Sequence, residues 1–338
     1  MSTLLDRRPA AGAALVDPFA RRIRYLRLSV TDRCDLRCVY CMPERMGFAE
    51  KPEVLSFEEI ETIAGAFIAL GVSKIRLTGG EPLVRRGILD LVRRLGAHLG
   101  AGLEELTLTT NATQLAGQAE ALFAAGVRRI NVSLDSRDPA RFARITRGGE
   151  LARVLKGIQA AQAAGLRIKI NTVALKAHNG AEIPDLIAWA HGQGFDISLI
   201  EVMPMGEVEE DRTDQFLSLA EVKQALERRW RLTPLPDTTG GPSRYVRVEE
   251  TGGRLGFITP LSHRFCEDCN RVRLTATGKL FLCLGQNENA DLRAVLRSGG
   301  DVREAIRAAI GLKPERHDFA EARLAAPAVP RRMSETGG

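Results

Sequence analysis

The sequence predicts an α/β fold, in which a partial, TIM-like (β/α)6 barrel is followed by a C-terminal extension of mixed strands and helices. Two observations lead to this prediction. Strand-like and helix-like segments alternate up to about residue 201, and four of the helical segments end at a glycine just before the next strand. A left-handed glycine commonly stops a helix, so its recurrence marks the same point in successive β-α units. The chemistry of such a barrel is expected at the C-terminal ends of its strands.

The elements of the barrel follow one another in chain order. Its strands are expected at Arg24–Val30, Lys74–Thr78, Leu106–Thr110, Ile130–Leu134, Arg167–Val173 and Ile197–Val202. Its helices are expected in the amphipathic stretches Phe57–Leu70, Gly87–Leu99, Ala116–Ala125, Leu151–Ala164 and Ile183–Gly192. The expected helix-stopping glycines are Gly71, Gly126, Gly165 and Gly194.

The pattern changes after residue 205, where the regular alternation ends. The sequence there predicts an acidic loop, a helix, a connection rich in Pro, Gly and Thr, a mixed β segment and two short helices. The acidic loop is expected at Glu207–Asp214, the first helix at Leu219–Trp230 and the connection at Pro234–Pro242. The two short helices are expected around Asp291–Arg297 and at Val302–Ile310. The chain therefore divides into an N-terminal extension (1–22), the barrel (23–205), a C-terminal region (206–325) and a flexible tail (326–338) ending in Gly-Gly.

Length and composition predict a cytoplasmic enzyme. The 338 residues are 44% hydrophobic, which is enough for a packed core, and no apolar run approaches the length of a membrane span. The first residues lack the continuous apolar core of a signal peptide. The net charge of +6 favours an acidic partner, which is either nucleic acid or a phosphorylated small molecule.

All six cysteines fall into two triplets, Cys34, Cys38 and Cys41 near the start and Cys266, Cys269 and Cys283 near the end. The tight C-x2-C spacings in a chain of this size favour metal binding in a reducing compartment over disulfides. Three clustered thiolates predict an iron–sulfur cluster held at three of its four corners. The fourth iron is then open to a ligand that the protein does not supply.

The first triplet follows the first expected strand, so it lies on a loop at the rim of the barrel. A zinc knuckle is the alternative interpretation. The turn Thr78-Gly79-Gly80-Glu81-Pro82 closes the second strand. Its glycines would let a ligand approach the backbone closely, and Glu81 can accept a hydrogen bond from an ammonium group. An ordinary βα turn is the other interpretation.

The second triplet also admits two interpretations. Together with His263 it would form a Cys3His zinc ribbon, which is a structural or nucleic-acid-binding module. However, Arg271 and Arg273 follow directly behind Cys269, and on a strand they share one face. Such a face suits a polyanion beside the metal, although arginine pairs also occur on solvated strand edges.

The spacing C-x3-C-x2-C, with the aromatic Tyr40 before the last cysteine, resembles the signature of the radical S-adenosylmethionine superfamily. Further motifs extend the resemblance over nearly the whole chain: R-L-T-G-G-E-P-L-V-R-R, L-T-T-N, I-N-V-S-L-D-S, K-I-N-T-V, I-E-V-M-P and the segment of the second triplet. Together they resemble the GTP 3′,8-cyclase family, which performs the first step of molybdenum cofactor biosynthesis. The resemblance implies a radical lyase with S-adenosylmethionine and two [4Fe-4S] clusters as cofactors. A 5′-deoxyadenosyl radical would take the ribose 3′-hydrogen of GTP, and the product would be 3′,8-cyclo-7,8-dihydro-GTP.

The resemblance also implies the roles of individual residues, with no protein side chain as a catalytic acid or base. The six cysteines would bind the clusters, the second of which would hold the guanine. Contacts to S-adenosylmethionine would come from Tyr40, Gly80, Ser133 and Met203. Contacts to GTP would come from Arg27, Arg76, Thr109, Lys169, Arg271, Val272 and Arg273. The implied partners are an external electron donor, the downstream cyclic pyranopterin synthase and a second copy in a homodimer, without membrane or nucleic acid.

Two positions depart from the family pattern. Asp35 stands where the family usually has Asn, and Ala112 follows T-T-N where Gly is usual, which puts the local loop geometry in doubt. The resemblance further implies that the Gly-Gly tail reaches into the active site, whereas its composition suits a disordered terminus. Two other functions stay open: a radical enzyme that modifies RNA or a peptide, and a zinc-ribbon binding protein without enzyme activity.

Overall fold

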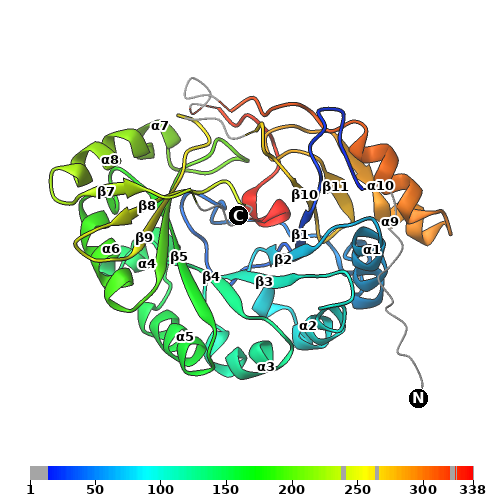
Figure 1. The fold of residues 1–338 in the computed structure, drawn as a ribbon, viewed down its shortest axis with the longest axis horizontal. Coiled ribbons are helices and arrows are strands. Elements are labelled where there is room, and N and C mark those ends of the chain that lie inside the picture. The colour runs from blue at the N-terminus through cyan, green and yellow to red at the C-terminus, as the bar shows by residue number, and fades with distance from the viewer. Residues whose placement is uncertain (1–13, 237–240, 263–265, 320–323, 325, 338) are drawn as a thin grey trace, which may run out of the picture.

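The structure is a computed structural model that describes residues 14–236, 241–262, 266–319, 324 and 326–337. Its strands form one twelve-stranded sheet in the order β12-β11-β10-β1-β2-β3-β4-β5-β6-β9-β8-β7. The six central strands are parallel and consecutive: β1 (Tyr25–Thr31), β2 (Lys74–Gly79), β3 (Glu105–Thr110), β4 (Arg129–Ser133), β5 (Arg167–Ala174) and β6 (Asp196–Glu201). The sheet curves into an incomplete ring with helices along its outer side, which confirms the predicted partial barrel (Figure 1).

Six α-helices cover the outside of these strands. They are α1 (Phe57–Ala69), α2 (Ile88–Gly96), α3 (Ala119–Ala124), α4 (Pro139–Thr146), α5 (Leu151–Ala163) and α6 (Ile183–Gly192). Short 3-10 helices lie at Lys51–Glu53, Pro82–Val84, Leu115–Gly117 and Gly180–Glu182. The sequence analysis predicted five of the six α-helices and missed α4, although Asp138 caps its first turn and Pro139 opens it.

The C-terminal region extends the sheet at both of its ends. The strand β10 (Arg271–Leu274) pairs in parallel with β1, and β9 (Arg254–Ile258) pairs in parallel with β6. The remaining elements are β7 (Leu232–Pro234), β8 (Arg244–Val248), β11 (Lys279–Phe281), β12 (Asn289–Asp291), α7 (Arg212–Gln215), α8 (Leu219–Glu227), α9 (Leu292–Arg297), α10 (Val302–Ile310) and α11 (Met333–Thr336). One sheet thus runs through the domain boundary expected at residue 205.

The ends of the helices follow from local chemistry. Ser56 and Glu59 form a reciprocal capping box at the start of α1, which satisfies two backbone N–H groups. The four expected helix-stopping glycines all have positive φ angles, and these are 92° for Gly71, 95° for Gly126, 85° for Gly165 and 76° for Gly194. The repeated glycine therefore has the conformational role that the sequence analysis gave it.

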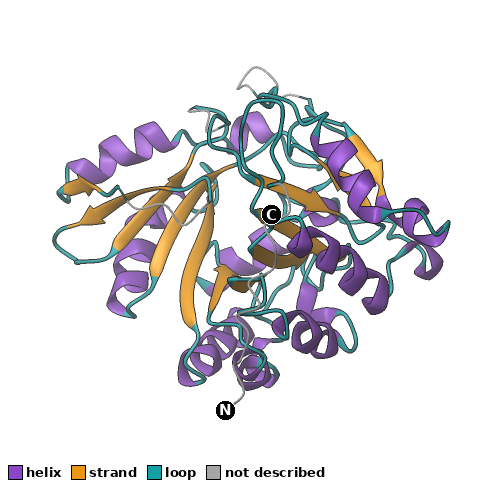
Figure 2. Cartoon of the chain, turned by 45° about the vertical axis from the view of Figure 1, so that its right-hand side comes forward, coloured by secondary structure: helices purple, strands orange, loops and turns teal. Residues whose placement is uncertain are grey.

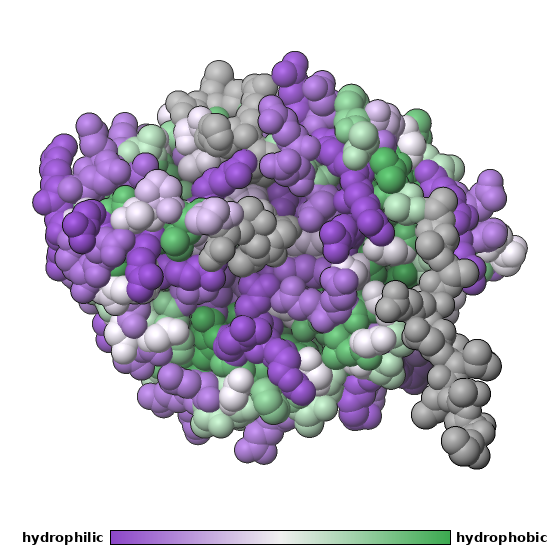
Figure 3. Space-filling view, in the orientation of Figure 1, coloured by the Kyte–Doolittle hydropathy of each residue, from purple (hydrophilic) through white to green (hydrophobic). Residues whose placement is uncertain are grey.

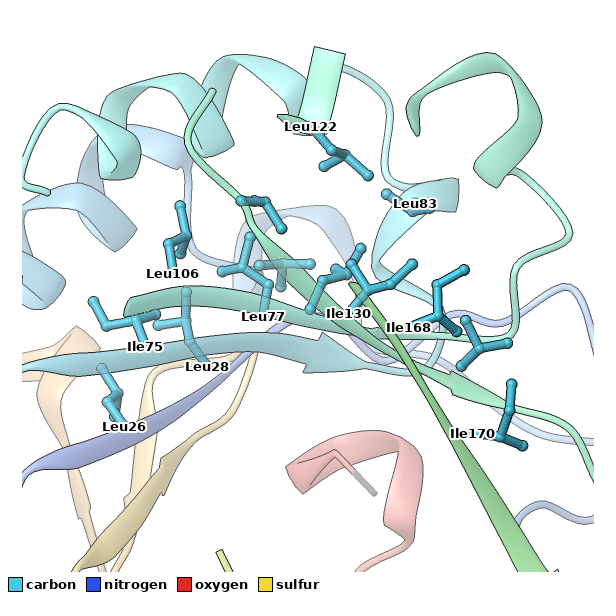
Figure 4. Packing of buried hydrophobic residues seen from close by; sticks show 14 of the residues in the cluster. Leu26, Leu28, Ile75, Leu77, Leu83, Leu106, Leu122, Ile130, Ile168 and Ile170 are labelled. Carbon is cyan, nitrogen blue, oxygen red and sulfur yellow. The ribbon is translucent and has the colours of Figure 1, made fainter. Parts of the chain in front are cut away.

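The hydrophobic core lies between the sheet and its outer helices, as Figure 4 shows for part of it. Leu26 and Leu28 of β1 and Ile75 and Leu77 of β2 are all fully or almost fully buried in this layer. Because side chains alternate across a strand, the residues between them face the inside of the ring. Polar residues such as Arg27 therefore face the interior of the barrel.

The outer surface is largely hydrophilic on the face shown in Figure 3. The large hydrophobic residues that are exposed in the described part of the chain are Val16, Phe19 and Leu312. None of the described helices is both long enough and apolar enough to cross a membrane.

The C-terminal tail differs from the expected flexible segment. Its helix α11 lies in the opening of the ring and packs against β1 and β2 (Figures 1 and 2). Ser334 and Thr336 are buried, and the backbone of Val329 pairs with the loop after β6, where the amide of Gly206 donates to its carbonyl at 2.9 Å. Residues 326–337 are therefore held by burial and backbone hydrogen bonds, as the resemblance implied, while Gly338 lies outside the described residues.

The two departures from the family pattern lie side by side. Asp35 accepts hydrogen bonds from the side chains of Asn111 (2.7 Å), Thr113 (2.6 Å) and Gln114 (3.1 Å), so its carboxylate ties the loop after β3 to the first cysteine. Burial alone would raise the pKa of Asp35, but these hydrogen bonds outweigh it and lower the pKa. Within that loop Ala112 has a φ of 64°, a left-handed conformation that costs a residue with a Cβ about 1–2 kcal/mol.

We predict that Ala112→Gly stabilises the protein, because glycine adopts a positive φ without steric cost. The gain in the free energy of unfolding should be about 0.5–1 kcal/mol, since part of the relief is offset by the greater freedom of glycine in the unfolded chain. Denaturant unfolding of the apoprotein measures it. Ala160→Gly, inside α5, is the control and should destabilise by about 1 kcal/mol. A loss of stability in Ala112→Gly would contradict the strain at this position.

Candidate functional site

The first candidate site is a cavity at the C-terminal ends of the barrel strands. All three cysteines of the N-terminal triplet line it, and so do the four residues expected to contact S-adenosylmethionine: Tyr40, Gly80, Ser133 and Met203. The structure thus brings together residues that are far apart in the sequence, since Cys34 and Met203 share one cavity. It does so because parallel strands end at the same edge of the sheet.

The cysteine loop is anchored to α4 and to the end of β4. The backbone amides of Arg37 and Val39 donate to the carbonyls of Thr146 (3.1 Å) and Ile145 (2.9 Å) at the end of α4. The hydroxyl of Tyr40 donates to a carboxylate oxygen of Asp135, which follows β4, at 2.7 Å. The helix that the sequence analysis missed therefore helps to position the first triplet.

Two glycines allow the end of β2 to pack tightly against the cysteine loop. A Cβ at Gly79 would lie 2.0 Å from the carbonyl oxygen of Thr31, and a Cβ at Gly80 would lie 2.2 Å from that of Arg33. The sequence predicted that a ligand approaches the backbone of these two glycines closely. In the structure, the backbone of the segment directly before Cys34 makes that close approach. Any side chain at these positions would displace the loop that carries the first triplet.

The carboxylate of Glu81 is fully engaged within the protein. It is buried and accepts hydrogen bonds from the amide of Leu83 (3.0 Å), the hydroxyl of Thr110 (2.8 Å) and the amide of Asn111 (2.6 Å). Burial raises its pKa to about 7, although these hydrogen bonds oppose the shift. Glu81 therefore joins the ends of β2 and β3, which is a structural use that the sequence analysis did not consider.

Buried acidic groups surround the first triplet. Burial, reinforced by the negative charges of Glu81 and Asp135 respectively, raises the pKa of Cys34 and of Cys41 to about 12. Burial also raises the pKa of Asp135 to about 6. Such surroundings disfavour bare thiolates and favour bound positive charge, which fits iron together with a sulfonium and an ammonium group.

The second candidate site is a neighbouring cavity inside the ring. All three cysteines of the C-terminal triplet line it, together with five of the residues expected to contact GTP: Arg27, Arg76, Lys169, Arg271 and Arg273. All five cationic side chains are buried. The structure thus places five cationic side chains and three thiols around one space.

Strand register aligns three of these cations in one row. Arg27 of β1 is paired with Arg273 of β10 on one side and with Arg76 of β2 on the other. One row further along the barrel, Lys169 of β5 is paired with Asn131 of β4. Residues in register on parallel strands point to the same face, so these polar groups converge inside the barrel.

Several polar atoms in this cavity lack a partner among the described residues. The Nε and Nη2 atoms of Arg27 and the Nε atom of Arg76 are buried without a hydrogen bond. Burial, together with the neighbouring arginines, lowers the pKa of Arg27 to about 10 and that of Arg273 well below its ordinary value. Unpaired buried donors are costly, so these groups fit a polyanionic ligand such as a triphosphate.

Two of the expected GTP contacts lie elsewhere. Val272 is in register with Leu26 and its side chain is buried in the hydrophobic core, so only its backbone is available to a ligand. Thr109 lines the first cavity, where its hydroxyl is buried without a partner among the described residues. Alternation along β10 explains the first case, because residues 271 and 273 face the cavity and residue 272 faces the other way.

Two residues that line the second cavity, Tyr25 and Asn131, were not expected from the sequence, and neither was Tyr245, which contacts Lys169. Tyr25 follows the same alternation as Arg27, and although burial alone would raise its pKa, the cations around it, led by Arg76, lower it to about 8. Lys169 donates to the hydroxyl of Tyr245 at 2.6 Å, and Asn131 lies beside Lys169. The period-two pattern alone would have identified Tyr25 and Asn131, whereas Tyr245 comes from the distant strand β8.

The tail contacts one of the cavity arginines. Nη1 of Arg273 donates to the carbonyl of Gly337 at 2.9 Å, and a Cβ at Gly337 would lie 2.2 Å from the side chain of Thr78. Met333 lines both cavities. The tail thus reaches into the site, where it contacts an arginine that lines the second cavity.

The two cavities share a wall. Asn171, Ile200, Met203 and Met333 line both of them, so the spaces beside the two cysteine triplets are adjacent. Asn171 and Ile200 come from β5 and β6, Met203 directly follows β6, and Met333 comes from α11. A group held in one cavity can therefore approach a ligand held in the other.

The donors at both triplets fit iron–sulfur clusters. The amide of Leu36 donates to the sulfur of Cys34 at 3.4 Å, and the ammonium of Lys313 donates to that of Cys269 at 3.6 Å. No three His, Cys, Asp or Glu side chains of the described residues group closely enough for a single metal ion. In a cluster each thiolate binds a different iron, and hydrogen bonds to the sulfurs, such as those from Leu36 and Lys313, tune the cluster. The zinc-ribbon alternative includes His263, which lies outside the described residues.

Comparison with known proteins agrees with this geometry. A model of the Radical SAM superfamily matches residues 28–190, and a model named Molybdenum Cofactor Synthesis C matches residues 195–319. A GTP 3′,8-cyclase of Erythrobacter litoralis is 62% identical over 97% of this chain and 100% of its own length. A GTP 3′,8-cyclase of Caulobacter vibrioides is 60% identical over 97% of this chain and 95% of its own length.

Solved structures resemble the chain in fold. Streptococcus suis SuiB bound to S-adenosylmethionine aligns with a TM-score of 0.60 over 85% of this chain and 68% of its own, at 18% identity. At that identity the likeness shows the radical S-adenosylmethionine fold alone. The GTP 3′,8-cyclases of Erythrobacter litoralis and Caulobacter vibrioides match this chain almost end to end and show its family. The chain belongs to the GTP 3′,8-cyclase family of the Radical SAM superfamily.

Proposed function

We propose that this protein converts GTP to 3′,8-cyclo-7,8-dihydro-GTP, which is the first step of molybdenum cofactor biosynthesis. The observation that carries the proposal is the pair of adjacent cavities, each lined by one cysteine triplet and both bounded by Asn171, Ile200, Met203 and Met333. The names of the relatives, with about 60% identity over nearly the full length, support the same substrate.

The first cavity would hold S-adenosylmethionine on the cluster of Cys34, Cys38 and Cys41. When bound, these groups supply a 5′-deoxyadenosyl radical, with one electron from an external donor. The protein's part is to position and to shield. Tyr40 is fixed by Asp135, and Gly79 and Gly80 keep the loop close to β2.

The second cavity would hold GTP. Its guanine would lie at the cluster of Cys266, Cys269 and Cys283, and its triphosphate would lie among Arg27, Arg76, Lys169, Arg271 and Arg273. The buried, partly unpaired guanidinium groups favour a ligand with several negative charges. With both ends held, the ribose would lie near the shared wall and face the first cavity, which is what hydrogen transfer requires. The product would then pass to cyclic pyranopterin synthase.

A radical enzyme that modifies a peptide is the second candidate, since SuiB has been solved bound to its precursor peptide SuiA. The row of cations across β10, β1 and β2 favours the nucleotide, because a peptide backbone offers no comparable charge.

We predict that Arg76→Ala weakens GTP binding about tenfold or more. The guanidinium is buried in the second cavity, and a hydrogen bond to a charged group contributes about 1.5–3 kcal/mol. Anaerobic calorimetry measures the affinity. Arg24→Ala, which removes an exposed arginine just before β1, is the control and should bind GTP like the unmodified protein. Equal affinity of both variants would show that Arg76 has only a structural role.

We also predict that the two triplets have different functions, which single cysteine variants can distinguish. Cys38→Ser should abolish the formation of 5′-deoxyadenosine, because it removes one ligand of the first cluster. Cys283→Ser should retain that activity, uncoupled from substrate, and should lose the cyclised product, because misplacement by about 1 Å can already cost a hundredfold in rate. Iron per chain, 5′-deoxyadenosine and cyclised product are measured on both variants. Full cyclase activity of Cys283→Ser would refute the proposed role of the second triplet.

A further inference from the structure

Buried cations hold the loops of the C-terminal triplet. Arg21, Lys313 and Arg331 are each less than a tenth exposed. Nη1 of Arg21 donates to the carbonyl of Cys266 at 2.8 Å, and Nη2 of Arg331 donates to the carbonyl of Cys283 at 2.9 Å. These cations come from the N-terminal extension, the segment after α10 and the tail, so three distant parts of the chain meet at this triplet.

Lys313 differs from the other two because it reaches a cysteine sulfur. Its ammonium lies 3.6 Å from Sγ of Cys269 and donates to the carbonyl of Leu282 at 2.6 Å. Arg21 is paired with the buried carboxylate of Asp17 at 2.6 Å, which offsets its charge. No ion pair between Lys313 and a carboxylate occurs among the described residues. The charge of Lys313 therefore acts directly on the sulfur of Cys269.

The N-terminal triplet has mixed surroundings: Nη1 of Arg37 donates to the carbonyl of Cys34 at 2.5 Å, the buried Arg212 acts on Cys41, and carboxylates lie beside them. Asp135 accepts from Tyr40, which lies between Cys38 and Cys41. Asp35 directly follows Cys34 in the sequence, and Asp135 itself is almost fully buried. The first triplet thus has both carboxylates and arginines beside it, whereas at the second triplet an ammonium donates directly to a sulfur.

From these contacts we propose that Lys313 is a positioning residue for the second cluster, and that its charge and hydrogen bond raise the reduction potential of that cluster above that of the first. The inference rests on the proposed function, because it requires a cluster at the second triplet. Reduction adds negative charge to a cluster, so a nearby cation and a hydrogen bond to sulfur stabilise the reduced form, and nearby carboxylates destabilise it. An electron donor that reduces the first cluster would then also keep the second one reduced.

The test is a redox titration of the reconstituted protein, with dithionite as reductant and electron paramagnetic resonance as readout. The signal of the second cluster is identified by its absence from Cys269→Ser. Lys313→Gln should shift the reduction equilibrium of that cluster at least tenfold toward the oxidised form, which is a midpoint lower by 59 mV for one electron. Lys313→Arg should restore the midpoint. Lys279→Gln removes the same charge at an exposed position of β11 and should leave it unchanged.

An unchanged midpoint in Lys313→Gln, or an equal shift in Lys279→Gln, would overturn the proposal. If Lys313→Gln cannot retain the second cluster, Lys313→Met decides, because it removes the same charge and hydrogen bond with a side chain of similar length and should lower the midpoint in the same way. An unchanged midpoint there would also overturn the proposal. Iron content distinguishes failure of the Lys313 proposal from failure of the proposed function. The unmodified protein should hold about eight irons per chain, whereas about four irons would show that the second cluster is absent.

Discussion

The register between β10, β1 and β2 is the constraint on which the site depends. It places Arg273, Arg27 and Arg76 side by side on the inner face of the ring, where burial and neighbouring cations make the positive charge of Arg27 and Arg273 costly. The sheet that aligns them is closed on its outer side by a hydrophobic core, so the strands cannot slip by one residue without burying charges among Leu26 and Ile75. A polyanion offsets this repulsion. The fold therefore positions the positive charges that bind the ligand before the ligand is present.

The same sheet explains why the two cysteine triplets face one barrel interior from opposite ends of β1. The first lies on the loop after β1, at the C-terminal edge of the barrel, and the second flanks β10, which extends the sheet beside β1. The C-terminal region thus completes a wall of the barrel, and the predicted boundary at residue 205 falls within one continuous sheet. The tail then fills the opening of the ring, where Arg273 binds the carbonyl of Gly337.

Much of this arrangement could be predicted from local patterns. Period-two alternation and the helix-stopping glycines identified the six barrel strands, since both signals are local in sequence. The composition of the tail could not predict its order, because that order depends on burial against β1 and β2 and on a distant arginine. For the same reason the use of Glu81 within the protein was missed, as its partners Thr110 and Asn111 lie at the end of β3 and in the loop after it. The resemblance also could not tell that the side chain of Val272 faces the core and leaves only its backbone to a ligand, because motifs ignore which face of β10 a residue occupies.

The central claim is that adjacent cavities bring the ribose of GTP to the radical formed at the first triplet. GTP that carries deuterium at the ribose 3′ position tests it most directly, with the reconstituted protein, S-adenosylmethionine and a reductant. The account predicts that deuterium appears in 5′-deoxyadenosine, as detected by mass spectrometry, in step with formation of the cyclised product. Formation of product with no deuterium in 5′-deoxyadenosine would contradict it.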